Sequence, residues 1–75
     1  MEKREIIERL KRGDKFVGCY PGAKRGLVMS VKNWNGRSED ATAVCECEGS
    51  TWQEEWDDMT VTVNAFINGE YGFVR

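Results

Sequence analysis

The apolar pattern of this chain changes character at Gly13. Before it, Ile6, Ile7 and Leu10 fall on one side of a helix whose other positions are charged. After it, apolar residues alternate with polar ones, which is the pattern of strands with one buried face. The sequence therefore predicts a helix over residues 2–12, stopped by Gly13, and then a sheet.

The second part of the chain is divided into strands by turn residues. Loop residues occupy 21–26, and the tetrapeptide N-W-N-G at 33–36 predicts a turn. Asn68-Gly69 is a strong hairpin signal, which would pair the segments on either side of it. The strands expected are residues 15–20, 27–32, 41–48, 60–67 and 70–74.

Residues 51–58 are predicted to form a short helix. Ser50 and Thr51 are each followed three positions later by Gln or Glu, which matches a capping box. In a helix, Trp52 and Trp56 would share one face.

These elements predict one small α+β domain covering residues 1–75. It would consist of an N-terminal helix, a curled antiparallel sheet of four to five strands, and the short helix near 51–58. This outline, and only the outline, resembles small SH3-like or partly open barrel domains. No apolar run approaches the roughly 20 residues that a membrane span needs, and the charged N-terminus lacks a signal-peptide core. A cytoplasmic location without membrane association is therefore the expectation.

Charge is divided unequally along the chain, although the net charge is only −2. Residues 1–37 carry ten basic and four acidic side chains, whereas residues 38–75 carry nine acidic side chains and one basic one. Such asymmetry indicates a charged partner, and each half offers a candidate surface.

The residue types present argue against an enzyme. The chain has no histidine, which excludes the usual general base and the Ser/His and Cys/His nucleophile pairs. The three cysteines, Cys19, Cys45 and Cys47, are too few for a four-ligand zinc site without histidine. They are predicted to be reduced structural thiols, and no metal or other cofactor is expected.

The first candidate surface is acidic and bears tryptophan. Tryptophan surrounded by charge is frequent at the energetic centres of protein interfaces, and the acids would suit a basic partner surface. The alternative is that the tryptophans only complete a small core. The candidate residues are Trp52, Glu54, Glu55, Trp56, Asp57 and Asp58.

The second candidate surface belongs to the basic half. Its cations and one aromatic side chain could contact the backbone and stack on the bases of a nucleic acid. The acidic second half argues against this alternative. The candidate residues are Lys15, Lys24, Arg25, Lys32, Trp34 and Arg37.

The sequence thus predicts a small non-enzymatic binding protein, regulatory or inhibitory, of the kind found among bacterial and phage accessory proteins. A protein partner engaged through the acidic face is the first choice, and a small nucleic-acid-binding barrel is the alternative. The prediction leaves open whether the chain forms a homodimer.

Overall fold

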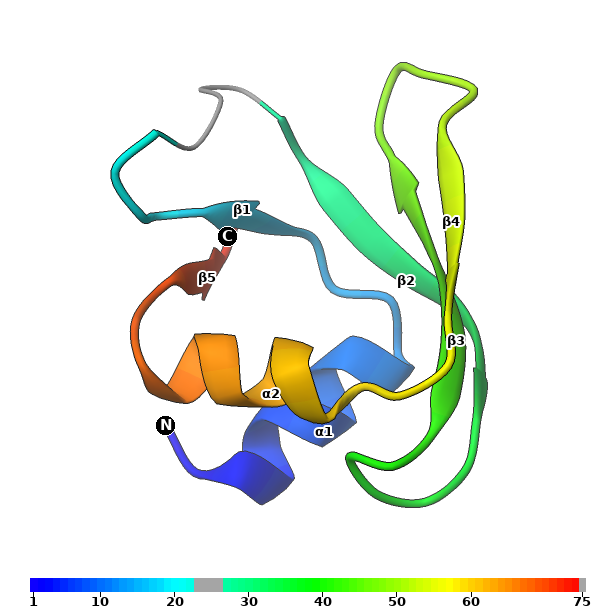
Figure 1. Cartoon of the computed structure of the whole chain (residues 1–75), viewed down its shortest axis with the longest axis vertical. Coiled ribbons are helices and arrows are strands. Elements are labelled where there is room, and N and C mark those ends of the chain that lie inside the picture. Colours follow the sequence, from blue (N-terminus) through cyan, green and yellow to red (C-terminus); the bar gives the residue numbers. More distant parts are fainter. Residues whose placement is uncertain (23–26, 75) are drawn as a thin grey trace.

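The described part of the chain folds into two helices and a single five-stranded antiparallel sheet (Figure 1). The structure is a computed structural model that describes residues 1–22 and 27–74. The elements are α1 (Lys3–Lys11), β1 (Phe16–Gly18), β2 (Met29–Asn35), β3 (Thr42–Cys47), β4 (Gln53–Trp56), α2 (Thr60–Ile67) and β5 (Tyr71–Phe73).

The N-terminal helix forms where the apolar pattern predicts it. Ile6, Ile7 and Leu10 are all buried. The helix ends in a Schellman motif at Gly13, which has a φ of 81°. The Gly13 N–H donates to the Leu10 carbonyl, and the next N–H donates to the Arg9 carbonyl, both at 3.1 Å.

The sheet has the strand order β4-β3-β2-β1-β5 and is not closed into a barrel. Both helices pack on the same face of this curved sheet (Figure 1). Phe16 lies at the centre, with Met29 opposite it on β2 and Phe73 opposite it on β5. The predicted α+β fold class, with an N-terminal helix before an antiparallel sheet, is confirmed.

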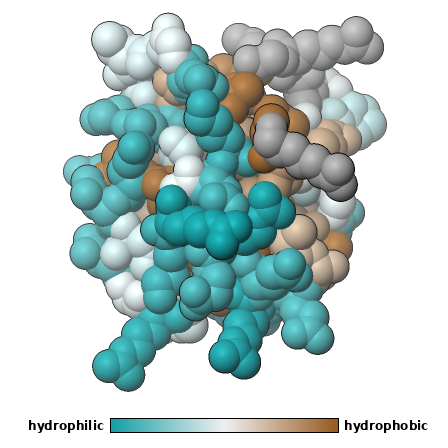
Figure 2. Space-filling model, turned by 180° about the vertical axis from the view of Figure 1, so that it is seen from behind, coloured by the Kyte–Doolittle hydropathy of each residue, from teal (hydrophilic) through white to brown (hydrophobic). Residues whose placement is uncertain are grey.

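The core lies between the helices and the sheet. Phe16 has no exposed surface, and its ring meets Phe66 edge-on at 5.3 Å and Tyr71 at 5.5 Å. Cys45 and Val63 are also fully buried. The side of the molecule opposite to that of Figure 1 is predominantly hydrophilic (Figure 2), as expected of surface held outside this core.

The predicted helix at residues 51–58 is wrong. Residues 53–56 form strand β4, in which Trp56 lies opposite Ala43 and Glu54 lies opposite Cys45 on β3. The Ser50 hydroxyl does accept a hydrogen bond, but from the Trp52 N–H, two residues on, so it stabilises a turn rather than a helix start.

The predicted strand at residues 60–67 is also wrong, because this segment forms α2. Met59, Thr62 and Val63 are buried, at the spacing that places them on one side of a helix. Asn68 and Gly69 therefore end a helix instead of joining two strands. The second helix of the fold lies here, and not at 51–58.

The turn predicted at residues 33–36 is replaced by a bulge within strand β2. Strand β2 continues to Asn35, and its pairing with β3 shifts register between Lys32 and Asn35. Asn33 has a φ of 54°, so the turn-forming residues create a bulge inside the strand. In the predicted loop at 21–26, positions 23–26 lie outside the described residues.

Candidate functional site: an acidic aromatic groove

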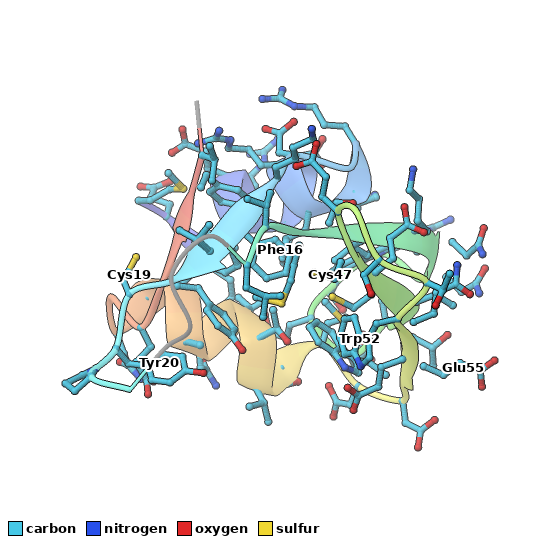
Figure 3. The ribbon with its side chains drawn as sticks, turned by 90° about the horizontal axis from the view of Figure 1, so that it is seen from above. Phe16, Cys19, Tyr20, Cys47, Trp52 and Glu55 are labelled. Atoms are coloured by element: carbon cyan, nitrogen blue, oxygen red, sulfur yellow. The ribbon has the colours of Figure 1, made fainter. Side chains whose placement is uncertain are left out.

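A solvent-open groove of about 710 Å³ lies between α2, the end of β4 and the aromatic residues near β1 and β5. In Figure 3, Tyr20 lies near one end of α2 and Trp52 lies beyond its other end. The groove is lined by Tyr20, Glu55, Trp56, Asp57, Asp58, Val61, Thr62, Asn64, Ala65, Asn68, Glu70 and Tyr71.

Helix α2 supplies the floor of this groove. Its buried side is occupied by Thr62 and Val63, so Val61 and Ala65, four positions apart, share another side of the helix. Val61 is 78% exposed, which is a large apolar exposure for a helix that has one face in the core. The floor therefore offers aliphatic surface to a ligand.

Aromatic residues form the walls. Trp56 is half-buried and packs against the core, with its indole on the same face of the sheet as Ala43. On the opposite wall, Tyr71 packs on Phe16, and Tyr20 meets Tyr71 edge-on at 6.2 Å. Because Trp56 and Tyr71 are anchored in the core, these walls are in place before any ligand binds.

The rim of the groove is negatively charged. Glu55, Asp57, Asp58 and Glu70 border it, and no Lys or Arg of the described chain lines it. Hydrogen bonds from the side chain and backbone of Thr60 lower the pKa of Asp58, so this carboxylate stays ionised.

Tyr71 differs from the rim because it is a neutral group in the wall. Burial, followed by the nearby Tyr20, raises the pKa of Tyr71, so its phenol keeps its proton at neutral pH. The groove thus combines a neutral aromatic wall with a carboxylate rim.

The structure brings four of the six residues predicted for the acidic face to this groove: Glu55, Trp56, Asp57 and Asp58. Glu54 and Trp52 lie outside the lining. Trp52 precedes β4 and is 40% exposed, so it does not simply complete the core.

Sequence reasoning missed the remainder of the groove. Tyr71 and Val61 were expected in a hairpin, and Tyr20 was expected at the end of the strand over residues 15–20. Glu70 follows the end of α2 and carries no signal of its own in the sequence. These residues meet the acidic segment only because α2 and β5 turn back across the sheet.

The basic residues proposed for nucleic acid are placed differently. Lys15 Nζ lies 2.8 Å from Glu48, and Lys32 Nζ lies 3.5 Å from Glu46, so both are paired with acids. Trp34 is half-buried and its indole N–H donates to the Gly36 carbonyl at 3.1 Å.

The other members of that basic set are Arg37, Lys24 and Arg25. Arg37 is exposed in a hollow that also contains Lys3, Arg4, Glu8 and Glu39. Lys24 and Arg25 lie outside the described residues. Lys15 and Lys32 are therefore paired with acids, whereas Arg37 lies in a hollow of mixed charge.

The three cysteines are free thiols. Cys45 and Cys47 are buried on the same face of β3, as the strand alternation predicts, whereas Cys19 is exposed and lies far from Cys47 (Figure 3). Within residues 1–22 and 27–74, no group of three or more Cys, Asp or Glu side chains is arranged to hold a metal ion.

No helix in the described part of the chain is long and apolar enough to cross a membrane. No protein-family model, curated protein or solved structure matches this chain.

Proposed function

We propose that this protein is a small binding protein whose groove takes a basic segment of a partner protein. The observation that carries the proposal is the composition of the groove, in which aromatic and aliphatic walls are bordered by four carboxylates and by no cation of the described chain.

Lysine and arginine side chains suit such a groove chemically. Their aliphatic stems can pack on Val61 and the aromatic walls while their charged ends reach the carboxylates. A cation near the faces of Trp56 or Tyr71 would gain cation–π energy of about 0.5–2 kcal/mol. A phosphate backbone, in contrast, would meet only negative charge at this rim.

Charge reversal at the rim tests the proposal. The probe is a flexible peptide of repeated Arg-Gly units, about ten residues long, titrated against the protein with indole fluorescence as the readout. The double variant Glu55→Lys with Asp57→Lys should weaken binding at least about tenfold, because opposite charges drive the encounter and hold the ligand. Binding by the parent should also weaken as salt is added.

A control variant with the same change in net charge distinguishes an effect of the groove carboxylates from an effect of the overall charge of the protein. Glu2→Lys with Glu8→Lys alters exposed acids at the N-terminal helix, away from the groove. It should leave the affinity within about twofold of the parent. Equal losses in both double variants would refute a specific groove, as would a parent protein that binds an oligonucleotide and ignores the basic peptide.

A further inference from the structure

We infer that the basic segment binds as an extended strand added to the free edge of β4, so that the sheet is continued by the partner. This inference rests on the proposed function and specifies the conformation of the ligand and the backbone groups that recognise it.

Strand β4 is an edge strand. Among the residues that the structure describes, it is terminal in the strand order and pairs with β3 alone. An edge of this kind presents unpaired backbone N–H and C=O groups, which can pair with an extended chain.

The pairing register identifies the groups that face outward. The Cys47 N–H donates to the Trp52 carbonyl at 3.4 Å, so this is a hydrogen-bonded pair. Because such pairs alternate along an antiparallel ladder, Glu54 and Trp56 also bond toward β3. The backbone N–H and C=O groups of Gln53 and Glu55 consequently point away from the sheet.

Charge on β4 selects the occupant. Its sequence is Q-E-E-W, with adjacent Glu54 and Glu55 on opposite faces and no basic residue. Two copies of this strand laid edge to edge would bring like charges together on both faces, which is unfavourable. A strand carrying lysine or arginine would instead pair opposite charges, so a basic segment fits and a second copy does not.

The edge is continuous with the groove. Trp56 faces the groove from β4, and Glu55, whose side chain is on the other face of the strand, borders the groove at the sheet edge. Side chains of an added strand would alternate between the two faces of the sheet. Those on one face would meet Trp56 and the groove, and those on the other would lie beside Glu55, at the outer margin of the molecule (Figure 3). The fitting ligand therefore alternates basic with apolar residues.

Peptides with and without backbone donors test this conformation. The probe is a peptide of repeated Lys-Val units about eight residues long, and its control carries N-methyl groups on alternate amides, which removes N–H donors but keeps every charge. The parent protein should bind the N-methylated peptide at least about tenfold more weakly. In the complex, the amide protons of Gln53 and Glu55 should exchange with solvent more slowly than in the free protein.

A matched pair of variants probes the same edge from the protein side. Glu55→Gln and Glu55→Pro remove the same charge, but only proline removes the outward N–H. Proline is tolerated at such edge positions because no ladder bond is lost, and a thermal melt would verify that the variant is folded. Glu55→Pro should bind the Lys-Val peptide about tenfold more weakly than Glu55→Gln.

The outcomes distinguish the two proposals. Equal affinity for the methylated and unmethylated peptides, with Arg-Gly binding retained, would overturn strand addition and leave the acidic groove standing. Failure of both the Arg-Gly and the Lys-Val peptides to bind would overturn both. Concentration-dependent dimers of the free protein that Glu55→Pro abolishes would show that a second copy occupies the edge, which also overturns the inference.

Discussion

Glu54 lies directly opposite Cys45 across the β3–β4 ladder, so an exposed carboxylate adjoins a thiol that has no solvent exposure. Burial is the main reason that the pKa of Cys45 is raised to about 12, and the neighbouring negative charge of Glu54 adds to the effect. The thiol is consequently protonated at any physiological pH.

The three thiols should therefore react in two classes. At pH 8 a disulfide reagent should modify one thiol per chain rapidly, at Cys19, because it is exposed and Cys45 and Cys47 are buried. In denaturant all three should react at the same fast rate. Cys19→Ser should remove the fast phase of the folded protein, and a fast phase that survives this substitution would contradict the burial of β3.

The stability of the protein at low pH should depend on Asp14. Hydrogen bonds from Arg12 and then Arg9 lower its pKa from 3.8 to about 2 in the folded protein. A carboxyl whose folded pKa is lowered stabilises the fold above its unfolded pKa, and this contribution is lost as pH falls from about 4 to about 2. Asp14→Asn should thus be less stable than the parent at pH 6, and the difference in free energy of unfolding should shrink as pH falls below about 4 and vanish below about 2. A constant difference across that range, measured by urea titration, would exclude the linkage.

Close backbone approach at Gly36 predicts a severe effect of one methyl group. A Cβ added there would lie 2.7 Å from the Cβ of Ala41, and the φ of 137° disfavours any side chain. Gly36→Ala should destabilise the protein by about 2 kcal/mol or more, through strain and overpacking together.

Gly49 provides the control for Gly36. It has a φ of 74°, but an added Cβ would meet nothing within 4 Å. Gly49→Ala should therefore show only the backbone effect, about 1 kcal/mol. In a domain of this size each kcal/mol corresponds to roughly 4–8 °C in melting temperature, so thermal melts should separate the two variants. Indistinguishable melting temperatures of Gly36→Ala and Gly49→Ala would contradict the close approach of Gly36 to Ala41.

The geometry at the end of α2 leads us to predict how substitutions of Gly69 change stability. Its φ is 80°, its N–H donates to the Phe66 carbonyl at 3.2 Å, and the Glu70 N–H donates to the Ala65 carbonyl at 2.8 Å. This is a Schellman motif, in which asparagine is the best substitute for glycine. Gly69→Ala should cost about 1 kcal/mol of stability, and Gly69→Asn should cost clearly less. Equal losses in chemical denaturation would argue against a left-handed residue at this position.

The same residues explain why the sequence misled at this point. Asn68-Gly69 is a hairpin signal when both residues have positive φ, but here Asn68 has a φ of −81° and only Gly69 is left-handed. Residues 60–67, rich in Val and Thr, have high strand propensity. Burial of Met59 and Val63 on one side overrides that preference, and this tertiary effect is not visible in local sequence.

Other elements could be predicted because local and tertiary preferences agree there. The stripe of Ile6, Ile7 and Leu10 is the buried side of α1, and Gly13 ends it. At the candidate site, Glu55, Trp56, Asp57 and Asp58 were identifiable from the run of acids and tryptophans in the sequence, whereas Glu70 was not. Tyr20, Tyr71 and Val61 were not, since their proximity depends on the path of the chain between them.

The order of the strands has a kinetic consequence. Strands β2, β3 and β4 follow one another and pair as neighbours. Their contacts therefore join residues that are close in the sequence, and these contacts should form early. Strand β5 instead joins β1, which brings Phe73 opposite Phe16 only after the whole intervening chain has been placed. We expect the rate-limiting step of folding to be this closure. Mutations at Phe73 that leave the pairing of β2, β3 and β4 intact should then mainly accelerate unfolding, because the contacts of Phe73 form late.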